Sequence, residues 1–516
     1  METSNKHSKE ENHAPALTQK EQIFQNEGRS FPGKTYTEVV LEPAYDEAKM
    51  HLLDPMMAIN KAHLIMLKEQ QLISETDAKK IAEAINSIDL QTIRTSCYSG
   101  QVEDLFFHIE SELLKEAGDI AGNLHIARSR NDMCITMFRL ALREKMQTAL
   151  ASVLFLKEQL LQFSKDHVDT LMIGYTHTQQ AQPTTLAHYI MAAADSLNRD
   201  IERFKLAYKH CNASPMGAAA FTTTGFNIDR EKMQDLLGFD SVVENSYDAI
   251  AGADYIAETM TSTQIIAINL GRFVQDLLLW STQEYDVLRV ADPYVQISSI
   301  MPQKRNPVSL EHIRSLLSSC AGNAKTVLTM LHNTPFGDIV DTEDDMQPYA
   351  WRSLSLLDKL CRLLGCIIAT ADINKDALRK RAAASFATIT ELADTIVRTD
   401  QLSFRTAHLI ASSIVKDALF HNISPQEITL KLVNKNAISI IGKELTLDET
   451  TLRQSLDPVY FVNIRTLPGG PNPNEVKRMI GIRLKQQKGQ AEWLTEIREK
   501  SEDALYALDE LLAKML

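Results

Sequence analysis

The strongest constraint on this fold is a series of long windows in which apolar residues recur at helical spacing. The window ITMFRLALREKMQTALASVLFLKEQLLQFSKDH (135–167) is longer than an average globular helix. Similar windows follow at 186–211, 253–282 and 309–332. The last two are apolar around most of their circumference, which is typical of helices buried in a bundle or at a subunit interface. The pattern predicts an all-α protein, and the helix lengths favour an oligomer over a large monomeric core.

Composition limits the classes of function. The chain of 516 residues has 54 Lys and Arg against 67 Asp and Glu, a net charge of −13. This charge argues against a nucleic-acid partner, which needs a basic surface to displace counterions, although a local basic cluster can still bind a small anion. Because no run of eighteen apolar residues occurs, we expect no membrane partner.

The six cysteines are scattered and contain no CxxC pair. This spacing indicates neither a zinc site nor a disulfide framework, so we expect no metal, and it fits a reduced, cytoplasmic setting. Residues 1–25 are polar and lack an apolar signal core, which predicts a disordered tail. Shorter helical patterns and the turn-rich stretch LPGGPNPNE (467–475) mark a change of character after a boundary near residue 380.

The first of three polar clusters is HIARSRND (125–132), just before the first long window. Asn131 or Asp132 would cap the following helix. Arg128 and Arg130 lie where a helix N-terminus also attracts anions. On local grounds alone, a capped helix start is the favoured interpretation of this cluster.

The second cluster is YTHTQQAQPTT (175–185), between two long windows. His177 is surrounded there by hydroxyl and amide side chains. Pro183 would suit the first turn of the next helix. A lone histidine is more often structural than catalytic, but the polar surroundings keep a functional role open.

The third cluster is QISSIMPQKRNPVSLE (296–311), which has no carboxylate before Glu311. Asn306 and Pro307 resemble an N-cap and first-turn pair. Ser298 and Lys304 have no such capping duty. A solvated loop would explain them, but Lys304 could also neutralise a carboxylate, and a serine could act as a base if its hydroxyl were activated.

Together the clusters supply cations, amide and hydroxyl donors, a histidine and a Ser/Lys loop. None contains a phosphate-binding glycine loop, a nucleotide fingerprint or metal-ligand spacing. This inventory suits a small-molecule polycarboxylate that undergoes proton transfer without a cofactor.

SSIMPQKRNP resembles the signature of the fumarase/aspartase superfamily, whose members eliminate a group from a succinyl unit and release fumarate. HIARSRND, YTHTQQAQPTTLAHYI, SFRTAH (403–408) and FVNIRTLPGGPNPNEV (461–476) narrow the resemblance to the argininosuccinate lyase family, from about residue 28 to the end. The resemblance implies a three-domain all-α fold over 26–130, 131–380 and 381–516. It also implies a homotetramer in which five long helices per chain build a twenty-helix core and three subunits build each active site.

The resemblance implies a role for each residue of the clusters. Ser298 would be the base that removes the proton beside a succinyl carboxylate, and Lys304 would stabilise the resulting aci-carboxylate. His177 would act on the leaving-nitrogen side, and Glu311 from another subunit would hold its orientation. Closure of the loop would exclude water. The substrate-binding residues that the resemblance implies are Ser129, Arg130, Asn131, Thr176, Gln179 and Asn306.

The sequence departs from the family on one side of the substrate. The residues that hold the arginine part in the family fall on Asp338, Glu343 and Met346, and an arginine of the family falls on Ala253. Either another segment supplies these contacts, or the alignment slips there, or the amine partner differs. Acidic replacements would suit a cationic distal group. Two smaller departures from the family remain. Ile126 replaces a threonine, and Ile297 replaces the glycine before the serine pair, a replacement that would stiffen the Ser/Lys loop.

Three functional interpretations follow. The first is a carbon–nitrogen lyase that cleaves an N-substituted aspartate, with argininosuccinate as the leading substrate and fumarate and arginine as products. The second is a related lyase for a different N-succinyl amine or an aminopolycarboxylate. The third is an inactive relative kept for structure or binding, which we disfavour because Ser298, His177 and Lys304 are all present.

Overall fold

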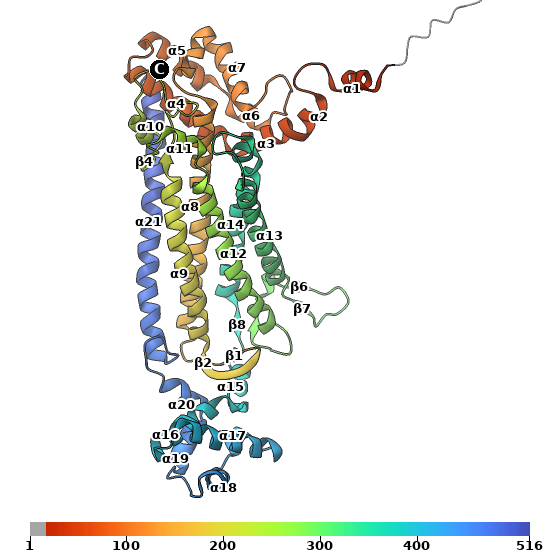
Figure 1. Cartoon of the computed structure of the whole chain (residues 1–516), viewed down its shortest axis with the longest axis vertical. Coiled ribbons are helices and arrows are strands. Elements are labelled where there is room, and N and C mark those ends of the chain that lie inside the picture. The colour runs from red at the N-terminus through yellow and green to blue at the C-terminus, as the bar shows by residue number, and fades with distance from the viewer. Residues whose placement is uncertain (1–16) are drawn as a thin grey trace, which may run out of the picture. The chain divides into compact units, whose positions relative to one another are not determined.

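The computed structural model describes residues 17–516, and helices dominate it (Figure 1). The chain divides into two compact units, which we describe separately. The first unit comprises Met1–Ala141 (described from residue 17), Ser214–Ile250 and Ala504–Leu516, and the second comprises Leu142–Ala213 and Ala251–Asp503. The strands of the described residues are short and pair only in two-stranded ladders, so the expectation of an all-α protein is confirmed.

The first unit is a cluster of short and medium helices around α4, where every residue from Met56 to Leu67 except Lys61 is buried. A helix buried on nearly all sides needs neighbours on every face, and α5 is one of them. Its elements are α1 (Gln19–Glu27), α2 (Lys34–Tyr36), the π-helical turn η1 (Thr37–Leu41), α3 (Glu42–His51), α4 (Leu53–Glu69), α5 (Glu75–Ser87), α6 (Leu90–Thr95), α7 (Leu105–Ala117), the 3₁₀ turn η2 (Gly118–His125), α10 (Arg230–Leu236), β4 (Ser241–Val242) and α11 (Ser246–Ala251).

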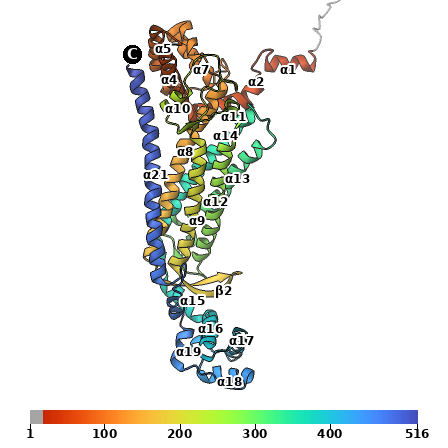
Figure 2. The same cartoon turned by 60° about the vertical axis from the view of Figure 1, so that its left-hand side comes forward.

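The second unit is organised by long helices that run side by side in Figures 1 and 2. Three of the predicted windows agree with the observed helices to within two residues, whereas α8 begins five residues earlier than expected. None of the described helices is long and apolar enough to cross a membrane. The long helices are α8 (Arg130–Lys165), α9 (Leu186–Cys211), α12 (Asp254–Trp280), α13 (Val308–Leu331), α14 (Gln347–Thr370) and α21 (Pro473–Ala513), of which α8 begins and α21 ends in the first unit.

Short helices between residues 375 and 463 follow the bundle and enclose an apolar core of their own, centred on Leu392, Ile410 and Val433. The ranges predicted for three domains stay a prediction. α21 lies inside the predicted C-terminal range 381–516, yet it packs along the bundle. The short elements are α15 (Lys375–Ala384), η5 (Phe386–Thr388), α16 (Ile389–Asp400), α17 (Phe404–Phe420), η6 (Pro425–Glu427), α18 (Leu430–Ile441), α19 (Glu449–Leu456) and α20 (Pro458–Asn463).

Polar contacts hold α21 on the bundle. Lys157 of α8 is fully buried and donates to Gln490 of α21 at 2.7 Å. Arg483 of α21 forms two hydrogen bonds with the carboxylate of Asp195 of α9, at 2.7 and 3.0 Å.

Near the other end of the chain, Thr18 caps α1 with a reciprocal capping box, so a helix occupies part of the segment predicted as a disordered tail. Residues 1–16 of that tail lie outside the described residues.

Three of the four strand pairs in the described residues belong to the second unit. The longest pair is a hairpin, and another closes the Ser/Lys loop at its base. The pairs are β1 (Leu171–Thr176) with β2 (Gln179–Thr185), β5 (Leu288–Arg289) with β8 (Asp372–Ile373), β6 (Gln296–Ile297) with β7 (Arg305–Asn306), and β3 (Ala213–Ser214) with β4.

Candidate active site

Ser129 immediately precedes α8, in the first unit. Its backbone N–H donates to Asp132 Oδ1 at 2.9 Å, and its Oγ accepts the backbone N–H of Asn131 at 3.3 Å. Ser129 therefore acts as the N-cap of α8, and the return bond from its backbone N–H to Asp132 is one half of a capping box. The expectation that Asn131 or Asp132 caps this helix is therefore wrong, because the helix begins at Arg130 and both residues lie inside its first turn.

Asp132 is fully buried and joins this turn to a second loop of the same unit. Its Oδ2 accepts the backbone N–H groups of Gly217 and Ala219 at 3.0 and 2.9 Å. Burial raises the pKa of Asp132 to about 6, although the three N–H donors favour the charged form. The sequence carried a signal for this role, because a serine followed three residues later by an acidic residue is a helix-start pattern.

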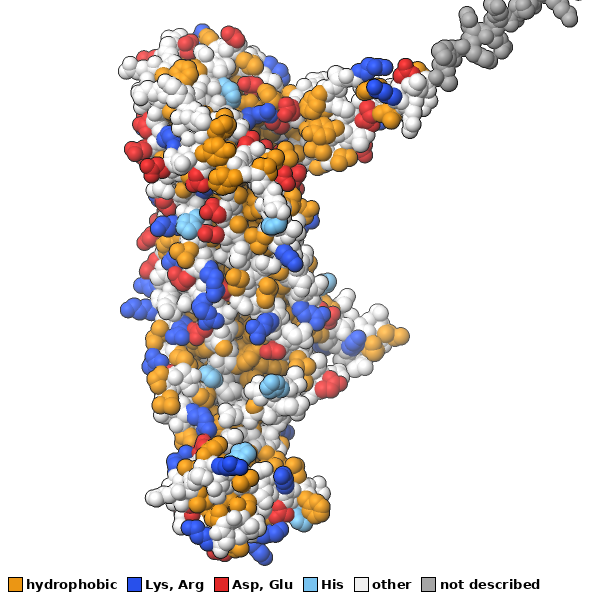
Figure 3. All heavy atoms as spheres, viewed as in Figure 1, with side chains coloured by type: hydrophobic (Ala, Val, Ile, Leu, Met, Phe, Trp, Pro, Cys, Tyr) orange, Lys and Arg blue, Asp and Glu red, His pale blue; other side chains and the backbone are white. Residues whose placement is uncertain are grey.

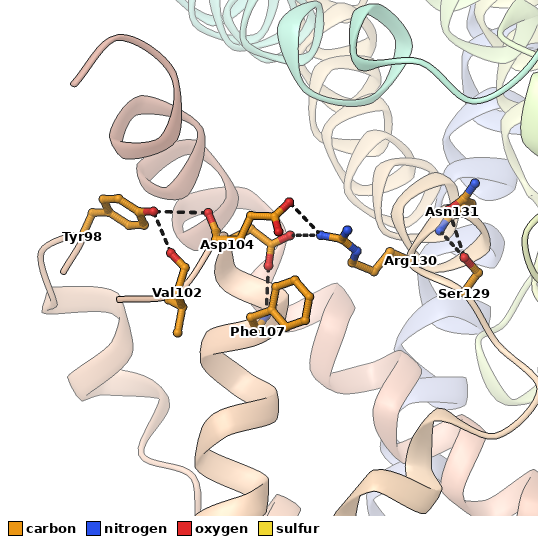
Figure 4. Close-up of polar contacts among 8 residues, drawn as sticks. Tyr98, Val102, Asp104, Phe107, Ser129, Arg130 and Asn131 are labelled. Carbon is orange, nitrogen blue, oxygen red and sulfur yellow. Dashed lines mark hydrogen bonds and ion pairs between the residues drawn. The ribbon is translucent and has the colours of Figure 1, made fainter. Parts of the chain in front are cut away.

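Arg130 projects toward acidic residues before α7, as Figure 4 shows. Its Nη1 lies 2.9 Å from Asp104 Oδ2 and 3.4 Å from Glu103 Oε1, and its guanidinium lies 4.9 Å from the ring centre of Phe107. Burial works against the charge of Arg130, but the two carboxylates outweigh it and raise the pKa. The guanidinium is therefore already held in place, and it remains partly exposed for an anionic ligand.

Arg128 has a different environment from Arg130. It is buried, donates to Asn60 Oδ1 at 2.8 Å, and burial lowers its pKa to about 10. The expectation that Arg128 lies where it attracts anions is not supported by this geometry, because its guanidinium faces the interior of the unit. Ala127 before it has φ +62°, a left-handed conformation that L-residues rarely adopt.

The predicted histidine cluster forms the tip of the β1–β2 hairpin in the second unit. His177 and Thr178 have φ of +51° and +62°, the signs that a two-residue type I′ turn requires at both positions. The β-branched Thr178 disfavours this conformation, and such strain is concentrated at functional sites. Thr176 and Gln179 are paired beside the turn, and all four residues are exposed.

The hairpin also corrects a prediction about Pro183. This proline lies in β2 opposite Ile173, not in the first turn of a helix. Thr185 caps α9 instead, through a hydrogen bond from the backbone N–H of His188. The ring of His188 reaches Thr184 Oγ1 at 2.8 Å and the carbonyl of Gly469 at 2.9 Å, so the LPGGPNPNE turn anchors the base of the hairpin.

The Ser/Lys loop extends from the bundle beside α13, between β6 and β7 (Figure 1). Ser298 Oγ accepts the backbone N–H groups of Ile300 and Met301 at 3.4 and 3.1 Å. Two backbone N–H donors therefore face the hydroxyl oxygen of Ser298. Ile300 is 82% exposed, and Figure 3 shows hydrophobic side chains at the tip of this loop.

Asn306 is not the cap of the next helix, contrary to the prediction. It pairs with Gln296 in the ladder at the base of the loop, and Pro307 precedes the first helical residue, Val308. This frees the Asn306 amide from capping. Lys304, Asn306 and Glu311 line one groove of about 610 Å³ together with Gln275 of α12 and Arg314 of α13.

The structure groups the predicted site residues into three sets. Ser129, Arg130 and Asn131 form one turn of the first unit, and His177, Thr176 and Gln179 form the hairpin of the second. Ser298, Lys304, Asn306 and Glu311 belong to the loop and the start of α13. Among the described residues, no hydrogen bond or ion pair joins the hairpin set to the loop set.

The segment aligned with the arginine-binding positions is acidic and includes the π-helical turn η4 (Asp341–Asp345). Asp338 is exposed and Glu343 is half-buried. Met346 is fully buried in the protein core, so it does not present a side chain to a ligand. These positions therefore do not form one polar surface.

Comparisons with known proteins agree on one family. The family model described as "Lyase" matches residues 45–322, and the one described as "Argininosuccinate lyase C-terminal" matches residues 386–463. The chain is 41% identical over 457 residues to argininosuccinate lyase 2 of Agrobacterium fabrum, which covers 88% of this chain and 90% of the relative. It is 38% identical over 422 residues to argininosuccinate lyase of Methanocaldococcus jannaschii, covering 82% and 86%.

Solved structures support the same assignment. EDDS lyase in complex with formate has a TM-score of 0.85 and 28% identity, with 96% of this chain and 98% of that chain covered. An EDDS lyase variant with bound fumarate has a TM-score of 0.84 and 29% identity, with coverage of 90% and 92%. With matching family models and relatives above 30% identity over most of its length, the chain belongs to the argininosuccinate lyase family of the fumarase/aspartase superfamily and is a carbon–nitrogen lyase.

Proposed function

We propose that this lyase cleaves argininosuccinate to fumarate and arginine by β-elimination. The observation that carries the proposal is the Ser298 loop, in which two N–H donors face the hydroxyl of Ser298, and Lys304 and Asn306 line the adjoining groove. The identity of 41% to an argininosuccinate lyase supports the choice of substrate.

The elimination consists of one proton transfer and the cleavage of one C–N bond. Ser298, as the base, takes the proton from the carbon beside a succinyl carboxylate, and the charge develops on that carboxylate. Lys304 and Asn306 stabilise the doubly negative aci-carboxylate. The electron pair then forms the C=C bond of fumarate while the C–N pair leaves with the nitrogen.

The leaving nitrogen takes up a proton on the His177 side, directly or through water. His177 is exposed at the tip of the hairpin. Because the type I′ turn fixes the backbone there, the Cα atom that carries the ring has a defined position. In the proposed mechanism Glu311 of another subunit orients this ring. Ser129, Arg130 and Asn131, with Thr176 and Gln179, bind the succinyl carboxylates.

A second candidate substrate is a different N-succinyl amine or an aminopolycarboxylate. It is favoured by the similarity to EDDS lyase structures and by Met346, whose burial removes one of the expected arginine contacts. The elimination chemistry is the same in both cases, and only the amine differs.

The deciding experiment follows fumarate release by ultraviolet absorbance from argininosuccinate and from a set of N-succinyl amines. Argininosuccinate should give the highest kcat/KM. A higher kcat/KM with an N-succinyl diamine would favour the second candidate over argininosuccinate. If no substrate in the set released fumarate, the proposed elimination would be refuted.

We also propose a homotetramer with shared active sites. Ile268 and Leu279 of α12 and Leu316 of α13 are exposed hydrophobic residues on the long helices, which fits burial against other copies. Mixing inactive Ser298→Ala and Arg130→Ala chains after dissociation should restore activity in hybrid oligomers. A monomeric mass, or no recovery in a confirmed hybrid, would contradict the shared site.

A further inference from the structure

Two exposed aromatic rings lie beside the candidate carboxylate-binding turn of the first unit. Phe221 and Tyr247 are 44% and 45% exposed, and their ring centres are 5.3 Å apart at an interplanar angle of 62°. Asn131 connects them to the turn, because its Nδ2 donates to the carbonyl of Ala220 at 3.4 Å. The rings are therefore neighbours of a residue proposed to bind the succinyl group.

Hydrogen bonds to a buried carboxylate hold the backbone just before Phe221. Asp132 binds the N–H groups of Gly217 and Ala219, which have φ of +82° and +53°. A Cβ at Gly217 would lie 2.7 Å from the side chain of Arg230, so this loop is closely packed against that arginine. The position of Phe221 thus depends on contacts deep in the unit and not on its own surface packing.

The backbone that carries Tyr247 is tied to the same loop. Arg230 donates from Nε to the carbonyl of Met216 at 2.9 Å and from Nη2 to the carbonyl of Val243 at 2.9 Å. Ser246 Oγ donates to the carbonyl of Phe221 at 3.0 Å. The two rings therefore form one preorganised surface, built from segments about 25 residues apart in the chain.

Two acidic residues flank one member of the aromatic pair in the sequence. Glu244 and Asp248, on either side of Tyr247 in the sequence, are both exposed. Arg230 is engaged with backbone carbonyls, and Arg130 is paired with Asp104. Exposed ring faces with carboxylates nearby attract cations, and a planar guanidinium stacks on such faces especially well.

We propose that Phe221 and Tyr247 recognise the cationic part of the leaving group, a guanidinium or alkylammonium. The inference rests on the proposed function, since it assigns the amine side of the same substrate. It replaces the arginine contacts that the segment around Met346 does not supply. The aromatic pair selects the amine by charge, while Arg130 and its neighbours bind the succinyl carboxylates.

The test compares arginine with citrulline, which has the same length but an uncharged ureido group. Calorimetric titration in saturating fumarate gives a dissociation constant for each. We expect the wild type to prefer arginine, and Phe221→Leu or Tyr247→Leu to lower this preference by about 2- to 30-fold. Tyr247→Phe should preserve most of it, because the ring remains.

Phe226→Leu is the matched control, since Phe226 is also exposed, at 54%, and lies outside the pair. The fumarate dissociation constant and the circular dichroism spectrum monitor the fold of each variant. A preference for arginine that is equal in wild type, Phe221→Leu and Tyr247→Leu would overturn the proposal. So would an equal loss in Phe226→Leu.

A second ligand pair separates this inference from the choice of substrate. Ethylenediamine and ethanolamine differ by a distal cation, and each can be titrated in fumarate. If argininosuccinate is not cleaved but ethylenediamine is preferred through the same rings, the proposed substrate fails and the inference holds. If argininosuccinate is cleaved and neither cation is preferred through the rings, the inference alone fails. If neither cation binds better than its neutral partner, the inference fails whatever the turnover.

Discussion

Asp132 Oδ2 and the backbone N–H of Ala219 form a 2.9 Å hydrogen bond in the interior of the first unit. The same carboxylate accepts the N–H of Ser129, which immediately precedes α8. One buried side chain therefore fixes both the turn proposed to bind the succinyl group and the loop that carries Phe221. We treat Asp132 as a positioning residue, because it acts through its neighbours.

Replacing Asp132 by asparagine should destabilise the protein. The amide keeps one acceptor oxygen but directs an N–H₂ group at backbone donors, and an unsatisfied buried donor costs about 1–3 kcal/mol. We expect a lower denaturant midpoint and a higher KM, with a smaller change in kcat. Asp119→Asn, at an exposed position of the same unit, is the control and should change neither.

The stability of the wild type should depend on the proton of Asp132. Burial raises its pKa to about 6 from an ordinary value near 4, so between these values the folded protein binds more protons than the unfolded chain. Stability from this group is therefore present below pH 4 and lost as pH rises through about 6. The difference in free energy of unfolding between wild type and Asp132→Asn should shrink over that window by up to about 3 kcal/mol. A constant difference in denaturant titrations would contradict the raised pKa.

Ala127→Gly should stabilise the protein. Ala127 has φ +62°, where an L-residue costs about 1–2 kcal/mol and glycine costs nothing in sterics, so a net gain of about 1 kcal/mol remains after the entropy of glycine. Thermal unfolding measures the change. Ala121→Gly, at a buried position without a positive φ, should instead destabilise, and the same sign in both variants would contradict the strain at Ala127.

Lys304→Met should lower kcat by about 10²–10³-fold, the usual cost of losing one group that stabilises a developing oxyanion. KM should change much less, because the charge that Lys304 stabilises develops only in the transition state. Steady-state kinetics of fumarate release separate the two constants. Arg305→Met is the comparison, since the guanidinium of Arg305 is engaged by Asp292 and by the carbonyl of Val290. Equal losses in both variants would indicate disruption of the loop.

The helical core follows from the sequence because its period is strong. Windows such as 186–211 carry enough apolar residues at three- and four-residue steps to determine both the helix and its buried face. The residues at which individual helices begin are harder to predict. Pro183 suits a first helical turn and an edge strand equally, and the choice of strand depends on pairing with Ile173, which is a tertiary contact.

The candidate site could be predicted as residue types but not as an arrangement. HIARSRND and the Ser/Lys loop stand out by composition, whereas the aromatic pair of Phe221 and Tyr247 carries no local signal. Its two members are brought together by Arg230 through backbone carbonyls, and such contacts leave no pattern in side-chain spacing. Asp132 was recognisable as part of a helix start, but not as the link to Ala219.

The most direct test of the elimination is the kinetics of Ser298→Ala beside Ser299→Ala. The two serines are adjacent, and only Ser298 Oγ accepts the two backbone N–H groups. With argininosuccinate, Ser298→Ala should lower kcat by about 10²–10⁴-fold, as expected for the loss of a general base, while Ser299→Ala keeps kcat within a few-fold. Equal kcat values in the two variants, or an active Ser298→Ala enzyme, would contradict the account.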